Sequence, residues 1–158
     1  MRRLVGLAVA IAAASIVAAC GLIDDGPPEG TDVSALHGTY AVQGVVTQDD
    51  CGASAFTGTL VLSGKADGTS LIATLTAQGA TGTGQRVYNG RMEPDGTFRA
   101  SGSGSMLLRS GAGSYGGTLL GKASAETITA VESLTLRQEA GCASASHTVV
   151  WAVNGRRG

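Results

Sequence analysis

The feature that most constrains the fold is a two-residue alternation of apolar and polar side chains, repeated in short stretches between glycine-rich turns. It is clearest at 97–109, where Phe98, Ala100 and Met106 alternate with polar residues such as Arg99 and Ser101. Successive side chains of a β-strand point to opposite faces, so this period indicates strands with one buried face. Eight such stretches are found, at 38–48, 55–63, 70–78, 85–92, 97–109, 115–122, 126–138 and 146–154.

Turn signals separate these stretches. Asp67-Gly68 and Glu93-Pro94-Asp95-Gly96 have the residues that tight turns prefer, and a further turn is expected at Gly111 to Ser114. The chain holds 25 glycines and only 15% charged residues, a composition that favours strands and turns over exposed helices. No helix is expected after Ala19, and the face of 115–122 is ambiguous between Leu119 and Leu120.

Consecutive strands with short connections predict an all-β fold, an eight-stranded antiparallel up-and-down barrel, with a two-sheet β-sandwich as the alternative. In such a meander the first and last loops lie at the same end. Cys51 is in the first loop and Cys142 in the last, so we expect a disulfide that closes the seam between the first and last strands. The predicted architecture is similar to that of lipocalin-type barrels, although their signature sequence is not found.

One position breaks the alternation. Glu132 falls on the inward face of 126–138, where a carboxylate is costly unless it is paired. Arg86 and Tyr88 are both phased inward on 85–92. Either Glu132 lies at a barrel mouth or is turned outward by a bulge, or it marks the polar end of a ligand cavity with Arg86 or Tyr88. In the second case Trp151, phased inward on the last strand, would line the same cavity with Phe56, Leu60 and Phe98.

The N-terminus has the layout of a secretory signal. Arg2 and Arg3 precede a 16-residue apolar run, Leu4 to Ala19, which is shorter than the roughly 20 residues of a membrane-spanning helix. The run ends in Val17-Ala18-Ala19-Cys20, which resembles the lipobox of bacterial lipoproteins. This resemblance implies cleavage before Cys20 and acylation of Cys20, which would anchor the protein in a membrane. An ordinary signal peptide and a retained transmembrane helix are the alternatives.

Three regions are therefore expected: a signal peptide at 1–19, a lipidated N-terminus and flexible tether at 20–35, and the barrel domain at 36–158. The tether assignment depends on the acidic, Pro- and Gly-rich sequence from Asp24 to Ser34. The expected location is the bacterial cell envelope. By analogy with Gram-negative lipoproteins, Gly21 after the cysteine would permit transfer to the outer membrane.

Other function classes lack support in the sequence. Removal of Arg2 and Arg3 with the leader leaves 9 basic and 12 acidic residues, and no basic patch predicts nucleic-acid binding. His37 and His147 lie in no nucleophile motif, no metal-ligand spacing is present, and Asp49-Asp50 is typical of a solvated turn. We expect no catalytic residues, no metal and no cofactor.

The sequence thus favours a non-enzymatic, lipid-anchored envelope protein that binds a protein or an envelope partner, or is structural. The alternative is a lipocalin-like carrier of a small hydrophobic molecule, with Arg86, Tyr88, Glu132 and Trp151 as ligand-binding residues. A hollow interior would favour the carrier, and a filled interior with an exposed apolar patch on the loops would favour partner binding through the loops.

Overall fold

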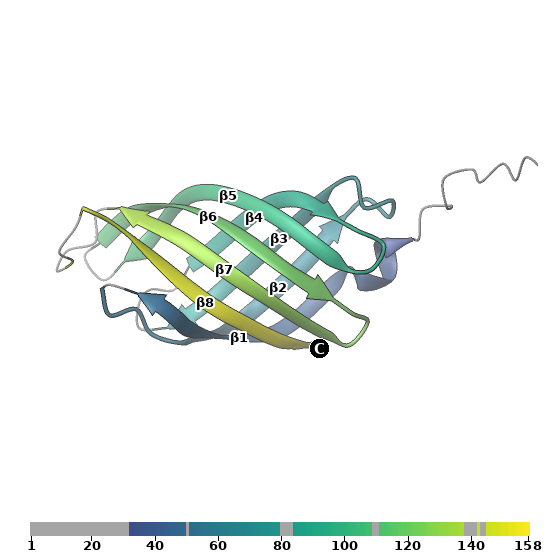
Figure 1. The fold of residues 1–158 in the computed structure, drawn as a ribbon, viewed down its shortest axis with the longest axis horizontal. Helices are drawn as coiled ribbons and strands as arrows, with labels where there is room; N and C mark the ends of the chain where they lie inside the picture. Colours follow the sequence, from purple (N-terminus) through teal and green to yellow (C-terminus); the bar gives the residue numbers. More distant parts are fainter. Residues whose placement is uncertain (1–31, 50, 80–83, 109–110, 138–141, 143–144) are drawn as a thin grey trace, which may run out of the picture.

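A computed structural model describes residues 32–49, 51–79, 84–108, 111–137, 142 and 145–158 as a closed eight-stranded antiparallel barrel (Figure 1). Each strand pairs with the next along the chain, and the last strand pairs with the first. The predicted up-and-down barrel is confirmed, and the sandwich alternative is wrong. The strands are β1 (Gly38–Asp49), β2 (Phe56–Gly64), β3 (Leu71–Gly79), β4 (Gly84–Met92), β5 (Thr97–Leu108), β6 (Gly111–Ala123), β7 (Thr127–Arg137) and β8 (Ser146–Arg157).

The two-residue alternation decides which side chains fill the barrel. Leu119 is fully buried whereas Leu120 is 43% exposed, which resolves the ambiguous phase of β6. The interior is filled along its length by aromatic and aliphatic side chains, the largest of them Trp151, Tyr40, Tyr88, Tyr115, Phe56 and Phe98. A barrel of eight strands is narrow enough for side chains to fill it.

Two strands are longer than predicted. The turn expected at Gly111 to Ser114 is wrong, because these small residues continue β6 and pair with the end of β5, up to Leu108 opposite Gly111. Likewise β8 continues through Gly155 to Arg157, because β1 offers these residues a partner from Tyr40 to Val42. In both cases a neighbouring strand supplies hydrogen bonds that local composition does not reveal.

Two turns at one end of the barrel share an Asp-Gly-Thr design. The carboxylates of Asp67 and Asp95 each accept hydrogen bonds from the backbone N–H and the hydroxyl of the threonine two residues later. The backbone hydrogen bond, followed by that of the hydroxyl, lowers the pKa of each carboxyl group. Gly68 and Gly96 adopt positive φ angles of 72° and 84°, which glycine adopts without steric cost. We call this end of the barrel, with the turns at 65–70, 93–96 and 124–126, the turn end.

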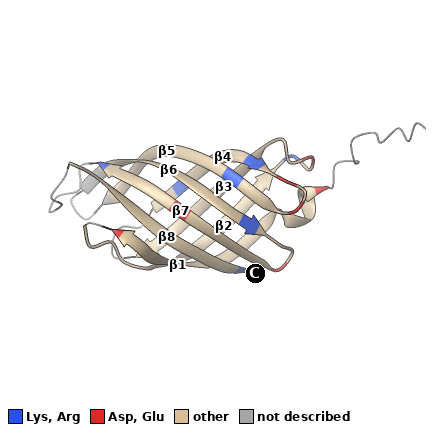
Figure 2. Cartoon of the chain, viewed as in Figure 1, with Lys and Arg blue, Asp and Glu red and all other residues tan. Residues whose placement is uncertain are grey.

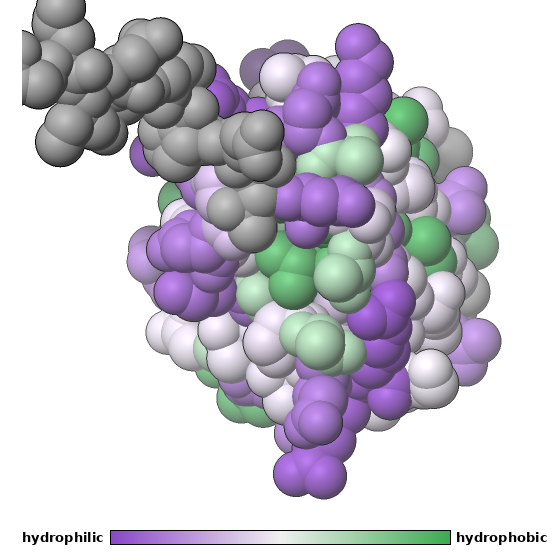
Figure 3. Space-filling view, turned by 90° about the vertical axis from the view of Figure 1, so that its right-hand side faces the viewer, coloured by the Kyte–Doolittle hydropathy of each residue, from purple (hydrophilic) through white to green (hydrophobic). Residues whose placement is uncertain are grey.

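A short 3₁₀ helix, η1 (Val33–Leu36), closes the turn end. Val33 is buried, and its N–H donates to Ala66 O at 2.8 Å. Arg157 donates to the carbonyl oxygens of Ala35 and His37 and so fixes η1 to the end of β8. Figure 3 looks onto this end, where hydrophilic side chains surround a small hydrophobic area. The segment 33–36 is thus packed against the barrel. Residues 33–35 were expected to belong to the tether, and residue 36 was expected to begin the domain.

The predicted leader, the lipidation site Cys20 and the tether up to residue 31 lie outside the described residues. Within the residues that are described, no helix has the length and apolarity needed to span a membrane.

Candidate functional site

The candidate site is a polar cluster inside the barrel. Arg86 and Tyr88 are two residues apart on β4, so both point inward, and Glu132 reaches the same level from β7. Arg86 Nε donates to Glu132 Oε1 at 2.6 Å, and Arg86 Nη2 donates to Glu132 Oε2 at 2.8 Å. The hydroxyl of Tyr88 also donates to Glu132 Oε1. Both carboxylate oxygens therefore have partners from the chain itself.

Two aromatic rings lie beside the guanidinium. The Cζ atom of Arg86 is 5.5 Å from the centre of the Phe56 ring and 5.9 Å from that of the Trp151 ring, within the range of cation–π attraction. The two rings meet edge to face, with centres 5.9 Å apart. Trp151 is the direct cross-strand partner of Glu132, and its Nε1–H donates to Ser54 O at 3.1 Å. The ion pair thus lies in an aromatic environment.

Burial and charge set the protonation of this cluster. The Arg86 side chain is 3% exposed and that of Glu132 is fully buried. Burial disfavours the charged guanidinium, yet the Glu132 carboxylate beside it raises the pKa of Arg86 above its usual value. Burial, and then the negative charge of Glu132, raise the pKa of Tyr88 well above 10. At neutral pH Arg86 is therefore a cation and Tyr88 a neutral hydrogen-bond donor.

The structure brings all four predicted ligand residues, Arg86, Tyr88, Glu132 and Trp151, into one cluster. Glu132 lies neither at a mouth nor on a bulge, because it is fully buried and the strand register continues past it on both sides. The inward phase of the sequence at 85–92 had predicted Arg86 or Tyr88 as the partner of Glu132. A ligand role for these residues stays a prediction.

The interior around this cluster is occupied by side chains. Four pockets stand out among the described residues, and none is lined by a residue of the cluster. The broadest has a volume of about 890 Å³ and crosses the outer wall from β7 to β3. Its lining includes the uncharged polar residues Gln43, Thr57, Thr59, Gln78 and Asn154. Space for a ligand is therefore found on the outside of the barrel.

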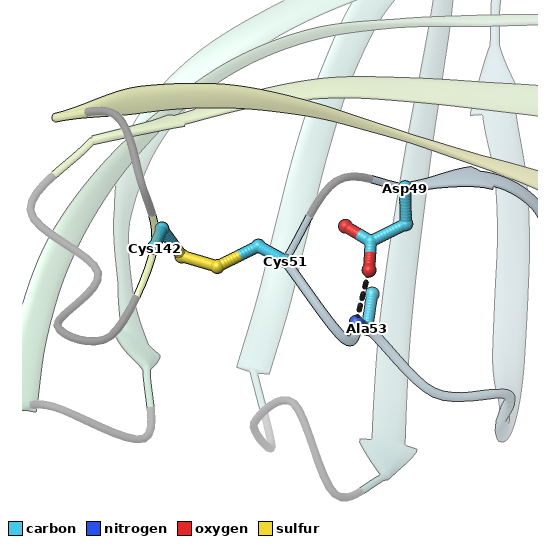
Figure 4. Close-up of a disulfide and its surroundings, with 4 residues drawn as sticks. All are labelled: Asp49, Cys51, Ala53 and Cys142. Atoms are coloured by element: carbon cyan, nitrogen blue, oxygen red, sulfur yellow. Dashed lines mark hydrogen bonds between the residues drawn. A yellow bond between two sulfur atoms is a disulfide. The ribbon is translucent and has the colours of Figure 1, made fainter.

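The predicted disulfide between Cys51 and Cys142 is confirmed, with Cα atoms 5.2 Å apart and a sequence separation of 91 (Figure 4). It joins the β1–β2 loop to the β7–β8 loop. These two loops lie at the same end of the up-and-down barrel, as the sequence predicted. Beside it, the carboxylate of Asp49 accepts a hydrogen bond from the Ala53 N–H.

One grouping was missed from the sequence. The sulfur atoms of Cys51 and Cys142 and a ring nitrogen of His147 lie within 4.8 Å of one another, a set that resembles three metal ligands. The only available signal was that His147 follows Cys142 by five residues. Because the two sulfur atoms are bonded to each other, they offer no thiolate to a metal. His37 is at the opposite, turn end of the barrel, so the two histidines cannot act together.

From β2 to β8 the outer wall carries charge of one sign, whereas β1 ends in the carboxylate of Asp49. Of the described strand residues from β2 to β8, those that are charged and face outward are basic: Arg91, Arg99, Lys122, Arg137 and Arg156. The carboxylates Asp67, Glu93, Asp95 and Glu126 lie in the turns instead (Figure 2). This arrangement suits an anionic partner on the wall.

Comparison with protein-family models, with curated proteins and with solved structures finds no match for this chain.

Proposed function

We propose that this protein is a non-enzymatic, lipid-anchored cell-envelope protein that binds a protein or an envelope component on the outer wall of its barrel. The observation that carries this proposal is the filled interior. Glu132, whose carboxylate would be costly in a barrel core without partners, already accepts hydrogen bonds from Arg86 and Tyr88. Recognition of a partner is then left to the outer surface.

The wall offers an apolar row for such contacts. Leu120 on β6 is the direct partner of Val131 on β7, and Val131 that of Ala152 on β8, which pairs in turn with Val45 on β1. Leu120, Val131 and Val45 are 43%, 47% and 53% exposed. Neighbouring exposed apolar side chains favour association with a partner.

The anchor is proposed from the leader and the lipobox-like sequence at Cys20. Cys20 is twelve residues before Asp32, the first described residue, so an extended chain would hold the turn end within about 40 Å of the membrane. Several acyl chains, at about 0.8 kcal/mol for each buried methylene, provide stable attachment.

The anchor is tested by Cys20→Ser in a bacterial host. We expect the wild-type chain in the membrane fraction, with a mass that shows loss of residues 1–19 and addition of acyl chains, and we expect both features to be lost in the variant. Ser34→Ala is the matched control, because it leaves the cysteine intact. A Cys20→Ser chain that still partitions fully with membranes as a processed protein would contradict lipid anchoring.

Partner binding is tested by native mass spectrometry of protein isolated from its own source in mild detergent. A complex with another envelope component, weakened by Val131→Lys but not by Thr135→Lys on the same strand, would support the wall as the binding surface. A bound lipophilic molecule that is lost on substitution of Trp151 would instead favour the carrier.

A further inference from the structure

Two arginines face each other directly on the outer wall near the turn end. Arg91 on β4 is the cross-strand partner of Arg99 on β5. Directly opposed residues have Cβ atoms about 5 Å apart, and like charges at this spacing are destabilising. The strands approach closely beside the pair, because a Cβ on Gly90 would lie 1.9 Å from Arg99 O. The two arginine side chains thus leave the wall at directly adjacent positions.

The chain supplies little negative charge to this pair. Arg91 Nε lies 3.0 Å from Glu93 Oε1, but the two side chains are 68% and 51% exposed, so the ion pair is well solvated. The nearest other turn carboxylate along the chain, Asp95, is engaged with Thr97 and with Lys122. For Arg99 we find no ion pair with any described residue.

The pair also lines two adjoining depressions in the wall. Their volumes are about 470 and 580 Å³, and both are lined by Arg91, Arg99 and Leu120. The larger one adds the hydroxyl groups of Ser101 and Thr118, whereas the hydroxyl of Thr69 already donates to Asp67. The smaller one is also lined by Glu93. Two guanidinium forks, the two hydroxyl groups of Ser101 and Thr118 and one exposed apolar side chain match an anionic group attached to an apolar body. Phosphate is the favoured anion, because guanidinium binds its oxygens in a bidentate manner.

We propose that Arg91 and Arg99 bind the phosphate of an anionic phospholipid headgroup in the membrane to which the protein is anchored, with Leu120 against the glycerol and upper acyl region. This inference rests on the proposed function, since the anchor brings this end of the barrel to a membrane. Bound phosphate would offset the repulsion between the two arginines. It would also fix the orientation of the barrel on its tether.

The position of the pair in the fold argues for a membrane lipid as the source of the phosphate. The described chain begins at the turn end, where Val33 N–H donates to Ala66 O. In the same turn, Gly68 O accepts a hydrogen bond from the N–H of Met92, the residue after Arg91. The entry of the chain into the barrel and the arginine pair are therefore neighbours at the end that the tether would hold near the bilayer (Figure 1).

The test uses the full acylated protein, purified and inserted into vesicles. One vesicle set contains phosphatidylcholine with a phosphatidylglycerol probe that bears a photoreactive group beside its phosphate, and the other contains the corresponding phosphatidylcholine probe. Crosslinked peptides are mapped by mass spectrometry. We expect crosslinks at 88–101 and 118–122 with the phosphatidylglycerol probe alone. Since each arginine near an anionic surface contributes about a fivefold gain in affinity, Arg91→Gln/Arg99→Gln should weaken crosslinking roughly thirtyfold.

The matched control is Arg137→Gln/Arg156→Gln, which removes two other wall arginines and should leave the crosslinks unchanged. Since Arg91 and Arg99 are exposed and repel each other, their glutamine variant should melt at or above the temperature of the wild type, which excludes misfolding as the cause of a loss. Equal crosslinking with both probes, or equal loss in both double variants, would overturn the proposal.

Competition by inorganic phosphate separates the two sources of the anion. Complete loss of the crosslink at low inorganic phosphate would show a site for free phosphate and overturn the lipid assignment. A failure of the anchor itself would be seen separately, as a Cys20 without acyl mass, and crosslinking of that material with added vesicles would still test the arginine pair.

Discussion

At the scale of the residue, the buried Arg86–Glu132 pair is the main departure from an apolar core. A buried ion pair adds little net stability over a well-packed apolar core of the same shape, but removal of one partner leaves an uncompensated charge. Here the charge is shared by a bidentate guanidinium, a phenol and two aromatic rings. Because β4 and β7 are not adjacent in the sheet, the cluster joins opposite sides of the barrel across its interior.

We therefore expect Glu132→Gln to reduce the free energy of unfolding by about 3–5 kcal/mol, since Arg86 would stay buried without its counter-charge. Equilibrium unfolding in urea measures this loss. Glu126→Gln, at an exposed turn, is the control and should change stability by less than about 0.5 kcal/mol. In the double variant Arg86→Met/Glu132→Gln a large part of the loss should be recovered, and equal stability of Glu132→Gln and wild type would contradict this account.

The sequence predicted the inward phase of Arg86, Tyr88, Glu132 and Trp151 but could not decide how they meet. Phase depends only on the two-residue period of each strand. Contact across a barrel depends on the register of every intervening strand pair, which is a property of the closed sheet. For this reason both a solvated Glu132 and a ligand cavity had remained open.

At the scale of the element, the β4–β5 ladder has the shortest run of direct pairing in the wall. Direct pairing is found only from Asn89 opposite Ser101 to Met92 opposite Phe98, although both strands continue beyond Asn89 and Ser101. Past this point the hydroxyl of Tyr115, on β6, accepts a hydrogen bond from the Val87 N–H at 3.2 Å. The ring of Tyr115 lies against Gly104, 3.1 Å from where a Cβ would be. A side chain from β6 thus crosses β5 and replaces a ladder hydrogen bond of β4.

Tyr115→Phe should remove this acceptor while it keeps the ring over Gly104. We expect a loss of about 1 kcal/mol in the free energy of unfolding, typical of one hydrogen bond. Amide hydrogen exchange at Val87 should become faster, whereas exchange at Val61, in the continuous β1–β2 and β2–β3 ladders, should be unchanged and is the internal control. Unchanged exchange at Val87 would show that the hydroxyl is dispensable.

Strand positions were predicted well where the pattern contains large apolar residues and poorly where it does not. The stretch 111–114 contains glycine, alanine and serine, which give no alternation and are common in turns. It is a strand because the long β5 partner extends to Leu108. The 3₁₀ helix η1 was missed for a similar reason, since the burial of Val33 depends on the turn at 65–70 and not on its own neighbours in sequence.

At the scale of the whole molecule, closure is the property that sets stability. The seam between β1 and β8 has nine paired residues with one irregularity between Val46 and Gln48, and the Cys51–Cys142 disulfide lies beyond its end. The closed barrel removes the free edges that would otherwise pair with other chains. The disulfide restricts the unfolded chain, in which it links residues 91 apart.

Loss of the disulfide should therefore destabilise the barrel. In the chain-entropy description a loop of this length contributes about 4–5 kcal/mol, which corresponds to a decrease of roughly 15–20 °C in the melting temperature of a domain of this size. Thermal unfolding of the wild type with and without a dithiol reductant measures it. Cys51→Ser should melt like the reduced wild type and should not respond to reductant; an unaltered melt on full reduction would contradict a stabilising role.

The seam also places Gly158 beside the start of β1, with its N–H 3.2 Å from Thr39 O. The polypeptide thus returns to where it entered the barrel, and a short linker could join the two places without crossing the interior. The order of the strands around the closed barrel therefore does not depend on which strand comes first in the sequence. Circular permutants opened at the 124–126 turn could retain the same wall, the same interior ion pair and the same disulfide.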